Sequence, residues 1–103
     1  MNVGDGTIHV VVESDLEDLI PNFMQRRHDD VGQLREALAA GELEVLRLIG
    51  HSMKGTGGGY GFDGIAGIGA AIGQAAKDKA LEASQTAVGR LVDYLDRVKV
   101  TFQ

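Results

Sequence analysis

The sequence predicts an all-α fold: an antiparallel up-and-down four-helix bundle with an extra N-terminal helical or extended segment. Apolar residues recur at spacings of three and four over most of the 103-residue chain, which is the period of amphipathic helices. Pro21 is the only proline, so long helices are possible. The connections between the predicted helices are short, as neighbouring antiparallel helices require.

Length and composition limit the possible functions. A chain of 103 residues is expected to form one domain with one apolar core. Its net charge of −5 repels phosphate backbones, so we expect no nucleic-acid partner. There is no apolar run of membrane-spanning length, no signal-peptide pattern and no cysteine. We therefore expect a cytoplasmic, monomeric protein with no membrane association and no thiol chemistry.

The first 13 residues are expected to form a flexible or extended lead-in to a domain at residues 14–103. Residues 1–7 are polar and glycine-rich. The run from Ile8 to Val12 is β-prone, but no second run of this kind is found, so we interpret it as an extended segment without a strand partner.

A first helical stretch is predicted from residues 14–15 to Gly41. Ser14 and Asp15 are good N-caps, and Gly41 suits a left-handed C-cap. Pro21 interrupts this stretch. Either it kinks one long helix, or a short helix ends before it and a new helix begins there. The apolar face carries Leu16, Leu19, Ile20, Phe23, Met24, Val31, Leu34 and Leu38.

Three further helices are predicted after Gly41. The second begins with Glu42 and Glu44. Its buried stripe comprises Leu46, Ile49, Met53 and either Thr56 or Gly57. Asp63 and Asp78 are the predicted N-caps of the third and fourth helices. The third helix buries Ile65, Ile68, Ile72 and Ala75 or Ala76, and its many glycines favour close approach of a neighbouring helix. The face of the fourth carries Leu81, Val88, Leu91, Leu95, Val98 and, if the helix extends that far, Phe102.

The functional interpretation depends on His51. An α-helix turns about 100° per residue, so His51 lies roughly 200° from both Ile49 and Met53, which are expected to face the core. The imidazole is therefore expected at the solvent face. An imidazole with its ordinary pKa near 6.5 is largely neutral and nucleophilic at neutral pH. An exposed histidine is usually only a surface residue, so a functional interpretation of His51 depends on the residues around it.

Residues three and four positions away share a helix face with His51. Lys54 places a cation where an anion bonded to the ring would lie. Gly55 leaves the ring open to a bulky partner, and Leu48 is an apolar residue expected at the surface, as on a docking face. Other residues of this face that a partner would contact are Glu44, Arg47 and Gly58. An open imidazole beside a cation is suited to carrying a phosphoryl group.

The segment from His51 to Phe62 resembles the signature of histidine-containing phosphotransfer (HPt) domains. It reads His-Ser-Met-Lys-Gly-Thr-Gly-Gly-Gly-Tyr-Gly-Phe. The signature is a histidine, two residues, Lys-Gly, several small residues, an apolar or aromatic residue, and glycine. The segment is particularly similar to the phosphotransfer domain of chemotaxis histidine kinases. The apolar spacing on either side also agrees, so the resemblance covers about residues 15–100.

The resemblance implies a phosphocarrier of a two-component multistep phosphorelay. His51 would accept a phosphoryl group from the aspartate of a response-regulator receiver domain and donate it to another. Lys54 would be the flanking cation, Gly55 would clear space for the receiver, and Gly61 would start the turn into the third helix. Such domains have no ATP site and no kinase activity of their own. The expected partners are receiver domains and a hybrid histidine kinase. No cofactor or metal is expected here, because the Mg²⁺ needed for transfer sits on the receiver.

One position departs from the family pattern. Members often carry Glu or Gln about 22 residues after the histidine, where the side chain orients the imidazole. That position is Gly73 here, and Gln74 beside it is turned away by about 100°. Two alternatives stay open: a non-catalytic helical adaptor that binds a signalling partner through the same face, and a domain phosphorylated directly by a separate kinase.

Other motifs are set aside. Residues 59–64 match G-x-G-x-x-G, but a dinucleotide site needs a preceding strand, and a helical run precedes them. The three histidines have no metal-ligand spacing. The basic run Arg26, Arg27 and His28 is interpreted as solvated surface, since the two acids that follow it nearly cancel its charge.

Overall fold

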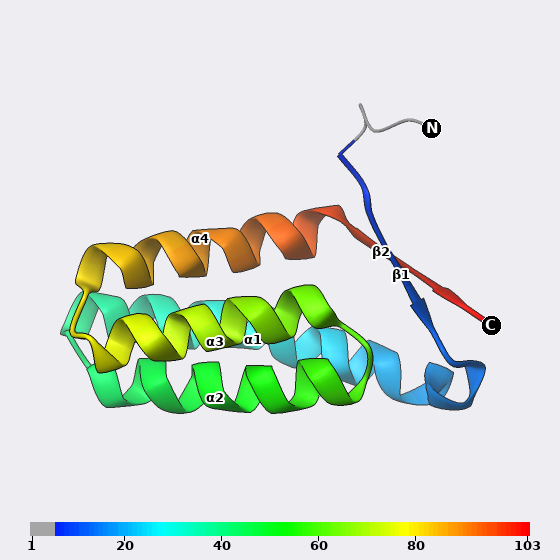
Figure 1. The fold of residues 1–103 in the computed structure, drawn as a ribbon, viewed down its shortest axis with the longest axis horizontal. Helices are drawn as coiled ribbons and strands as arrows, with labels where there is room; N and C mark the ends of the chain where they lie inside the picture. Colours follow the sequence, from blue (N-terminus) through cyan, green and yellow to red (C-terminus); the bar gives the residue numbers. More distant parts are fainter. Residues whose placement is uncertain (1–5) are drawn as a thin grey trace.

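The computed structural model describes residues 6–103 and shows four helices packed along one another, with a two-stranded sheet beside one end of the bundle (Figure 1). The helices are α1 (Ile20–Ala40), α2 (Leu43–Gly59), α3 (Asp63–Lys77) and α4 (Leu81–Arg97). Successive helices run in opposite directions (Figure 1), which confirms the predicted antiparallel all-α bundle. The first residues of the predicted lead-in, 1–5, lie outside the described part of the chain.

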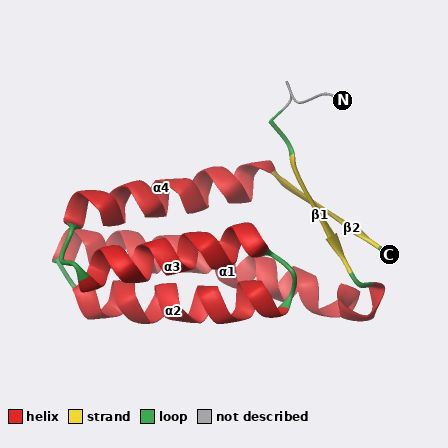
Figure 2. Ribbon diagram, in the orientation of Figure 1, coloured by secondary structure: helices red, strands yellow, loops and turns green. Residues whose placement is uncertain are grey.

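The N-terminal segment pairs with the C-terminal segment of the chain (Figure 2). Strand β1 (Ile8–Val12) runs parallel to strand β2 (Val98–Phe102), and the two are aligned residue by residue without a bulge. The pairing continues past the strands, because the backbone N–H of Gln103 donates to Val12 O (3.1 Å) and the N–H of Ser14 donates to Gln103 O (2.7 Å). The expectation that the run from Ile8 to Val12 has no strand partner is therefore wrong.

The partner strand was missed because the fourth helix was predicted to extend too far. Helix α4 ends at Arg97, and Val98 already has an extended backbone, with φ −75° and ψ 136°. From Val98 to Phe102 apolar residues alternate with polar ones. Three of the five residues are β-branched, a composition that favours a strand. Val98 and Phe102 therefore belong to the sheet. Leu81, also predicted on the buried face, is 45% exposed.

Pro21 starts a helix and does not kink one. A 3₁₀ helix, η2 (Ser14–Leu19), precedes α1, and Pro21 lies in the first turn of α1, where a missing N–H breaks no helical hydrogen bond. The second of the two alternatives for this proline is thus confirmed. At the other end of α1, Gly41 has φ 69°, the left-handed conformation predicted for it.

The two aspartates predicted as N-caps do not have that role. Asp63 is the first residue of α3, and no side-chain capping bond is formed there. Asp78 ends α3: its N–H donates to Gln74 O, and its carboxylate accepts a hydrogen bond from Gln74 Nε2 at 3.1 Å. Helix α4 begins only after a left-handed turn at Lys79, whose φ is 57°.

Glycines bring α2 and α3 into close contact, as predicted. A Cβ added to Gly50 would lie 2.7 Å from both Gly69 O and Gly73 N. A Cβ added to Gly69 would lie 2.8 Å from Lys54 N. Side chains of any other residue type would force these backbones apart, so the glycines fix the separation of the two helices beside His51.

Elsewhere the core is filled by the apolar stripes of the four helices. In α2 the last buried position is Gly57, while Thr56 is exposed, which decides between the two residues predicted there. The largest fully buried side chains of the bundle are Leu34, Leu46, Met53, Phe62, Ile65, Ile72 and Leu91. This packed interior leaves the opposite side of α2 facing solvent.

Candidate functional site

His51 lies on the exposed side of α2, as predicted. The next residues of α2 that enter the core are Gly50 and Met53, and these hold the helix against α3. Within residues 6–103 the imidazole has no hydrogen-bond partner. The ring is therefore accessible to a reacting group, and neither nitrogen is occupied by a contact within the described chain.

A hollow of about 340 Å³ opens beside His51 between α2 and α3. Its lining comprises Arg47, His51 and Lys54 from α2, and Gly69, Ala70, Gly73, Gln74 and Lys77 from α3. Besides the histidine, the lining contains three cations and no carboxylate. This hollow is consequently electropositive in a protein whose net charge is −5, and it suits an anion.

Arg47 is held at the edge of this hollow by Glu44. The guanidinium donates from Nη2 to Glu44 Oε2 (2.6 Å) and from Nε to Glu44 Oε1 (2.9 Å). These hydrogen bonds lower the pKa of Glu44 and raise the pKa of Arg47. The paired groups are exposed, so the structure places both of these predicted contact residues on the surface near His51.

The predicted docking face on α2 is open. A Cβ added at Gly55 or at Gly58 would meet no heavy atom within 4 Å. Leu48 is 53% exposed, which makes it one of the few large apolar side chains at the surface. Leu48, Gly55 and Gly58 do not line the hollow that contains His51 and Lys54. The predicted site residues therefore lie in two places, some in the cationic hollow and others on the open face of α2.

Gly73 lies in the hollow, at the position where an orienting side chain was expected. A Cβ there would have only Arg47 O within 4 Å, at 3.9 Å, so the position has room for a side chain but carries none. Gln74 also lines the hollow, but its amide donates to Asp78 Oδ1. Neither residue forms a hydrogen bond with His51, and the ring is not oriented from α3.

Gly61 makes the turn between α2 and α3, as predicted. Its φ is 88°, a conformation that glycine adopts without strain. The next residue, Phe62, is fully buried, and its N–H donates to Gly57 O at 2.8 Å. The turn therefore joins the two helices that form the hollow and fixes their ends together.

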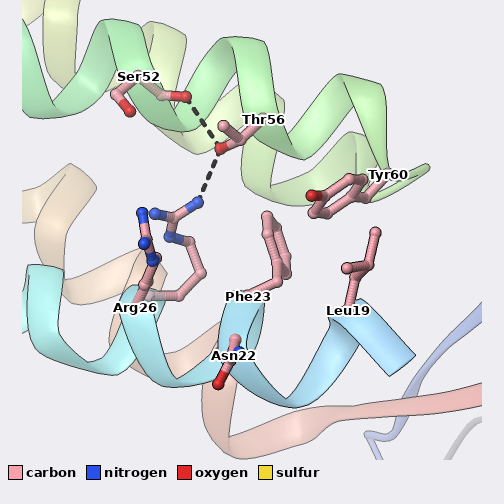
Figure 3. A pocket seen from close by; sticks show the side chains of 8 residues that line it. Leu19, Asn22, Phe23, Arg26, Ser52, Thr56 and Tyr60 are labelled. Atoms are coloured by element: carbon pink, nitrogen blue, oxygen red, sulfur yellow. Dashed lines mark hydrogen bonds between the residues drawn. The ribbon is translucent and has the colours of Figure 1, made fainter. Parts of the chain in front are cut away.

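Arg27 is buried, so the interpretation of the basic run as solvated surface is wrong for this residue. Only 5% of Arg27 is exposed. Its Nη1 donates to Thr56 Oγ1 (2.7 Å), and that hydroxyl donates to Ser52 O (3.0 Å), one residue after His51 (Figure 3). These hydrogen bonds connect α1 to α2, the helix that carries His51.

Two further contacts hold Arg27 in place. Its Nε lies 2.9 Å from Asp30 Oδ2, and its guanidinium carbon lies 4.9 Å from the centroid of the Phe23 ring. Burial raises the pKa of Asp30, against the opposing effect of Arg27. The sequence contained a signal for this burial: Phe23, Arg27 and Leu34 follow one another at helical spacing on the core-facing side of α1.

A second pocket, of about 290 Å³, lies between α1 and α2, on the other side of α2 from the hollow beside His51 (Figure 3). It is lined by Leu19, Asn22, Phe23, Arg26, Arg27, Ser52, Thr56 and Tyr60. His51 is not part of this lining, so its ring opens toward α3 and not toward this pocket.

Among the residues that the structure describes, no group of three or more His, Cys, Asp or Glu side chains is arranged so that it could hold a metal ion. Over the same residues, 6–103, no helix is both long enough and apolar enough to cross a membrane.

The fold and the site together define a class of protein: an antiparallel four-helix bundle that presents an exposed histidine, flanked by lysine, midway along its second helix. The family model of the Hpt domain matches residues 18–101, and the chain belongs to the Hpt domain family. Neither the curated proteins nor the solved structures gave a match. Domains of this family act in phosphotransfer within two-component phosphorelays, where they interact with receiver domains and histidine kinases.

Proposed function

We propose that the protein is a phosphocarrier and that His51 carries the phosphoryl group between receiver-domain aspartates. The observation that supports this most strongly is the exposed, unpartnered ring of His51 beside a hollow lined by cations, in a chain that belongs to the Hpt family. A neutral imidazole nitrogen attacks the phosphorus of an aspartyl phosphate. The new P–N bond forms as the P–O bond breaks, and the aspartate leaves as a carboxylate with the bonding electrons.

Each predicted site residue has a role in this proposal. Lys54 stabilises the negative charge of the phosphoryl group, and Gly55 leaves room for the receiver to reach the ring. Leu48 and Gly58 supply the apolar and flat parts of the docking face, and the Glu44–Arg47 pair contacts the partner at its rim. Gly61 and Gly73 act structurally, at the turn and in the hollow.

The proposed protein has no ATP site and no kinase activity, and it requires no cofactor of its own. The Mg²⁺ that assists transfer is bound by the receiver, where it neutralises charge on the transferring phosphoryl group. Its partners are receiver domains and a hybrid histidine kinase, and we place the protein in the cytoplasm as a monomer.

The test is to mix the protein with a receiver domain phosphorylated on its aspartate. The expected product is phosphate on the carrier that is labile in acid and stable in base, as phosphohistidine is. His51→Gln should abolish labelling, and His28→Gln, which alters an exposed histidine of α1, should leave it unchanged. Equal labelling of the His51→Gln variant, or no labelling of the unmodified protein by any receiver, would contradict the proposal.

A second candidate is a helical adaptor that binds a receiver through the same face without chemistry. The absence of an orienting side chain at Gly73 favours it, since Gln74 is engaged with Asp78. Tight receiver binding that His51→Ala leaves unchanged, without transfer, would select the adaptor. Direct phosphorylation by a separate kinase would instead show as ATP-dependent labelling only when that kinase is added.

A further inference from the structure

The hollow between α2 and α3 contains more positive charge than the flanking lysine alone supplies. Lys77, in the last turn of α3, lines it together with Lys54 and Arg47 from α2. Lys77 is 26 positions after His51, and only the packing of α3 against α2 brings the two residues to one hollow.

We infer that the phosphoryl group on His51 lies in this hollow and that Lys77 binds it from α3 while Lys54 binds it from α2. This inference rests on the proposed function, because it concerns the phosphorylated form of His51. It assigns to α3 a cationic contact with the transferred group, in place of the side chain that would orient the ring.

Space in the hollow supports the inference. Three of the five α3 residues that line the hollow are small, namely Gly69, Ala70 and Gly73, and at Gly73 a Cβ would have just one heavy atom within 4 Å. These small residues help to leave a volume of about 340 Å³ next to the ring. The position that would otherwise contain an orienting side chain is thus open to a ligand of the ring.

The distribution of charge also points to Lys77. Arg47 is already paired with Glu44 through two hydrogen bonds. Within residues 6–103, neither Lys54 nor Lys77 lies within ion-pair distance of a carboxylate. The two lysines are therefore the cations of the hollow whose charge remains uncompensated.

The pocket on the other side of α2 is less suited to the phosphoryl group. It contains Arg26 and Arg27, but His51 does not line it. Arg27 is also committed to Thr56 and Asp30. A phosphoryl group bonded to the His51 ring consequently meets unpaired cations only on the α3 side.

A cation near a phosphoryl group favours its dianion and lowers the pKa of its last ionisation. The charged groups that face the phosphoryl group in the hollow are Arg47 and Lys54 from α2 and Lys77 from α3, besides the imidazole that carries it. One unit charge about 6 Å away in water changes such a pKa by about half a pH unit.

The experiment uses the full chain phosphorylated chemically with phosphoramidate, so that neither a receiver nor a kinase is needed. Phosphorus NMR then follows, as the pH is varied, the phosphohistidine signal that the His51→Gln variant lacks. Lys77→Gln should raise the pKa of the phosphoryl group by about half a pH unit, and Lys54→Gln should raise it by a similar amount. Lys99→Gln, which removes the same charge from the exposed face of β2, should leave the titration unchanged.

If the pKa of the phosphoryl group is the same in Lys77→Gln as in Lys99→Gln, the inference is overturned. This holds for any result obtained with Lys54→Gln. Failure of the proposed function would look different: the carrier phosphorylated on His51 would pass nothing to any receiver. The two failures are therefore separable in one set of samples.

Discussion

At the scale of single residues, access to His51 depends on what its neighbours lack. Gly55 has no side chain beside the ring, and its added Cβ would meet open space. Helical position alone was sufficient to predict the exposure of His51, Lys54 and Leu48, because the apolar stripe of α2 fixes which side faces solvent. The burial of Arg27 was not predicted, since its contact with Thr56 joins two helices and depends on how they pack.

Replacing Gly55 with a larger residue tests the clearance of the ring. Gly55→Gln should reduce transfer from a phosphorylated receiver at least about tenfold, because the side chain obstructs the docking face. The free energy of unfolding should change by less than about 1 kcal/mol, since glutamine is the better helix former at this open position.

The matched control for this substitution is Gly32→Gln on α1, where an added Cβ also meets nothing within 4 Å. It should leave transfer unaffected. The small donor phosphoramidate should still label His51 in the Gly55→Gln variant. Normal transfer from the receiver to this variant would show that the clearance argument is wrong.

The half-buried carboxylate of Asp30 predicts a pH dependence of stability. Burial raises its folded-state pKa above the ordinary value of 3.8. The folded state therefore binds the proton more tightly than the unfolded state, and the stabilisation that this gives at low pH is lost as the pH rises through the folded-state pKa. The free energy of unfolding of the unmodified protein should fall over this range relative to that of Asp30→Asn.

Urea unfolding of the two proteins at a series of pH values between about 3.5 and 6.5 measures this difference. Asp93→Asn is the control, since Asp93 is an exposed carboxylate paired with Arg97 on α4. A difference between the unmodified protein and Asp30→Asn that stays constant with pH, or grows as the pH rises, would contradict the prediction.

At the scale of secondary-structure elements, the spacing of α2 and α3 shapes the site. The glycines of α3 were predicted to allow close helix approach, and the structure confirms this, because the backbones of Gly69 and Gly73 both lie against Gly50 of α2. The two positions differ in what an added Cβ would meet: at Gly69 it would touch α2, and at Gly73 it would face the hollow. The sequence cannot distinguish these two roles, because both glycines lie on the same side of α3, one turn apart. Which of them would point a Cβ at α2 depends on how the helices cross.

Alanine substitutions separate the two glycines. Gly69→Ala places a Cβ 2.7 Å from Gly50 O and should lower the free energy of unfolding by about 1–3 kcal/mol. Gly73→Ala meets only a contact at 3.9 Å and should raise it by up to about 1 kcal/mol, because alanine favours the helix. Equal effects of the two substitutions in urea unfolding would show that the helices are not packed as described.

At the scale of the whole molecule, the four-helix fold followed from the apolar periodicity, but the closure of the chain ends did not. The pairing of β1 with β2 joins segments about 90 residues apart, and nothing local to either segment identifies its partner. The alternation of apolar and polar residues after Arg97 is typical of a strand, yet Val98 and Phe102 also fit the helical spacing of the last helix. Two patterns were compatible with these residues, and tertiary pairing decided between them.

Removal of residues 98–103 tests the contribution of this sheet. The shortened protein should retain the four helices and phosphoryl transfer, because the strands lie outside the lining of the His51 hollow. Its free energy of unfolding should fall by about 1–3 kcal/mol, since β1 loses its partner and Val12, which is 2% exposed, loses part of its cover. Loss of transfer in a protein whose helical circular dichroism is intact would place the sheet in the functional site, against this account.

The most direct test of the central claim identifies the ring that bears the phosphoryl group. The protein is labelled with the heavy nitrogen isotope, phosphorylated by a receiver, and examined by NMR of its histidine ring nitrogens. The ring resonances of His51 should shift, with a phosphorus coupling on one nitrogen, while those of His9 and His28 should stay in place. A phosphoryl group on either of these other rings, or a His51 ring unchanged in a protein that carries phosphate, would contradict the central claim.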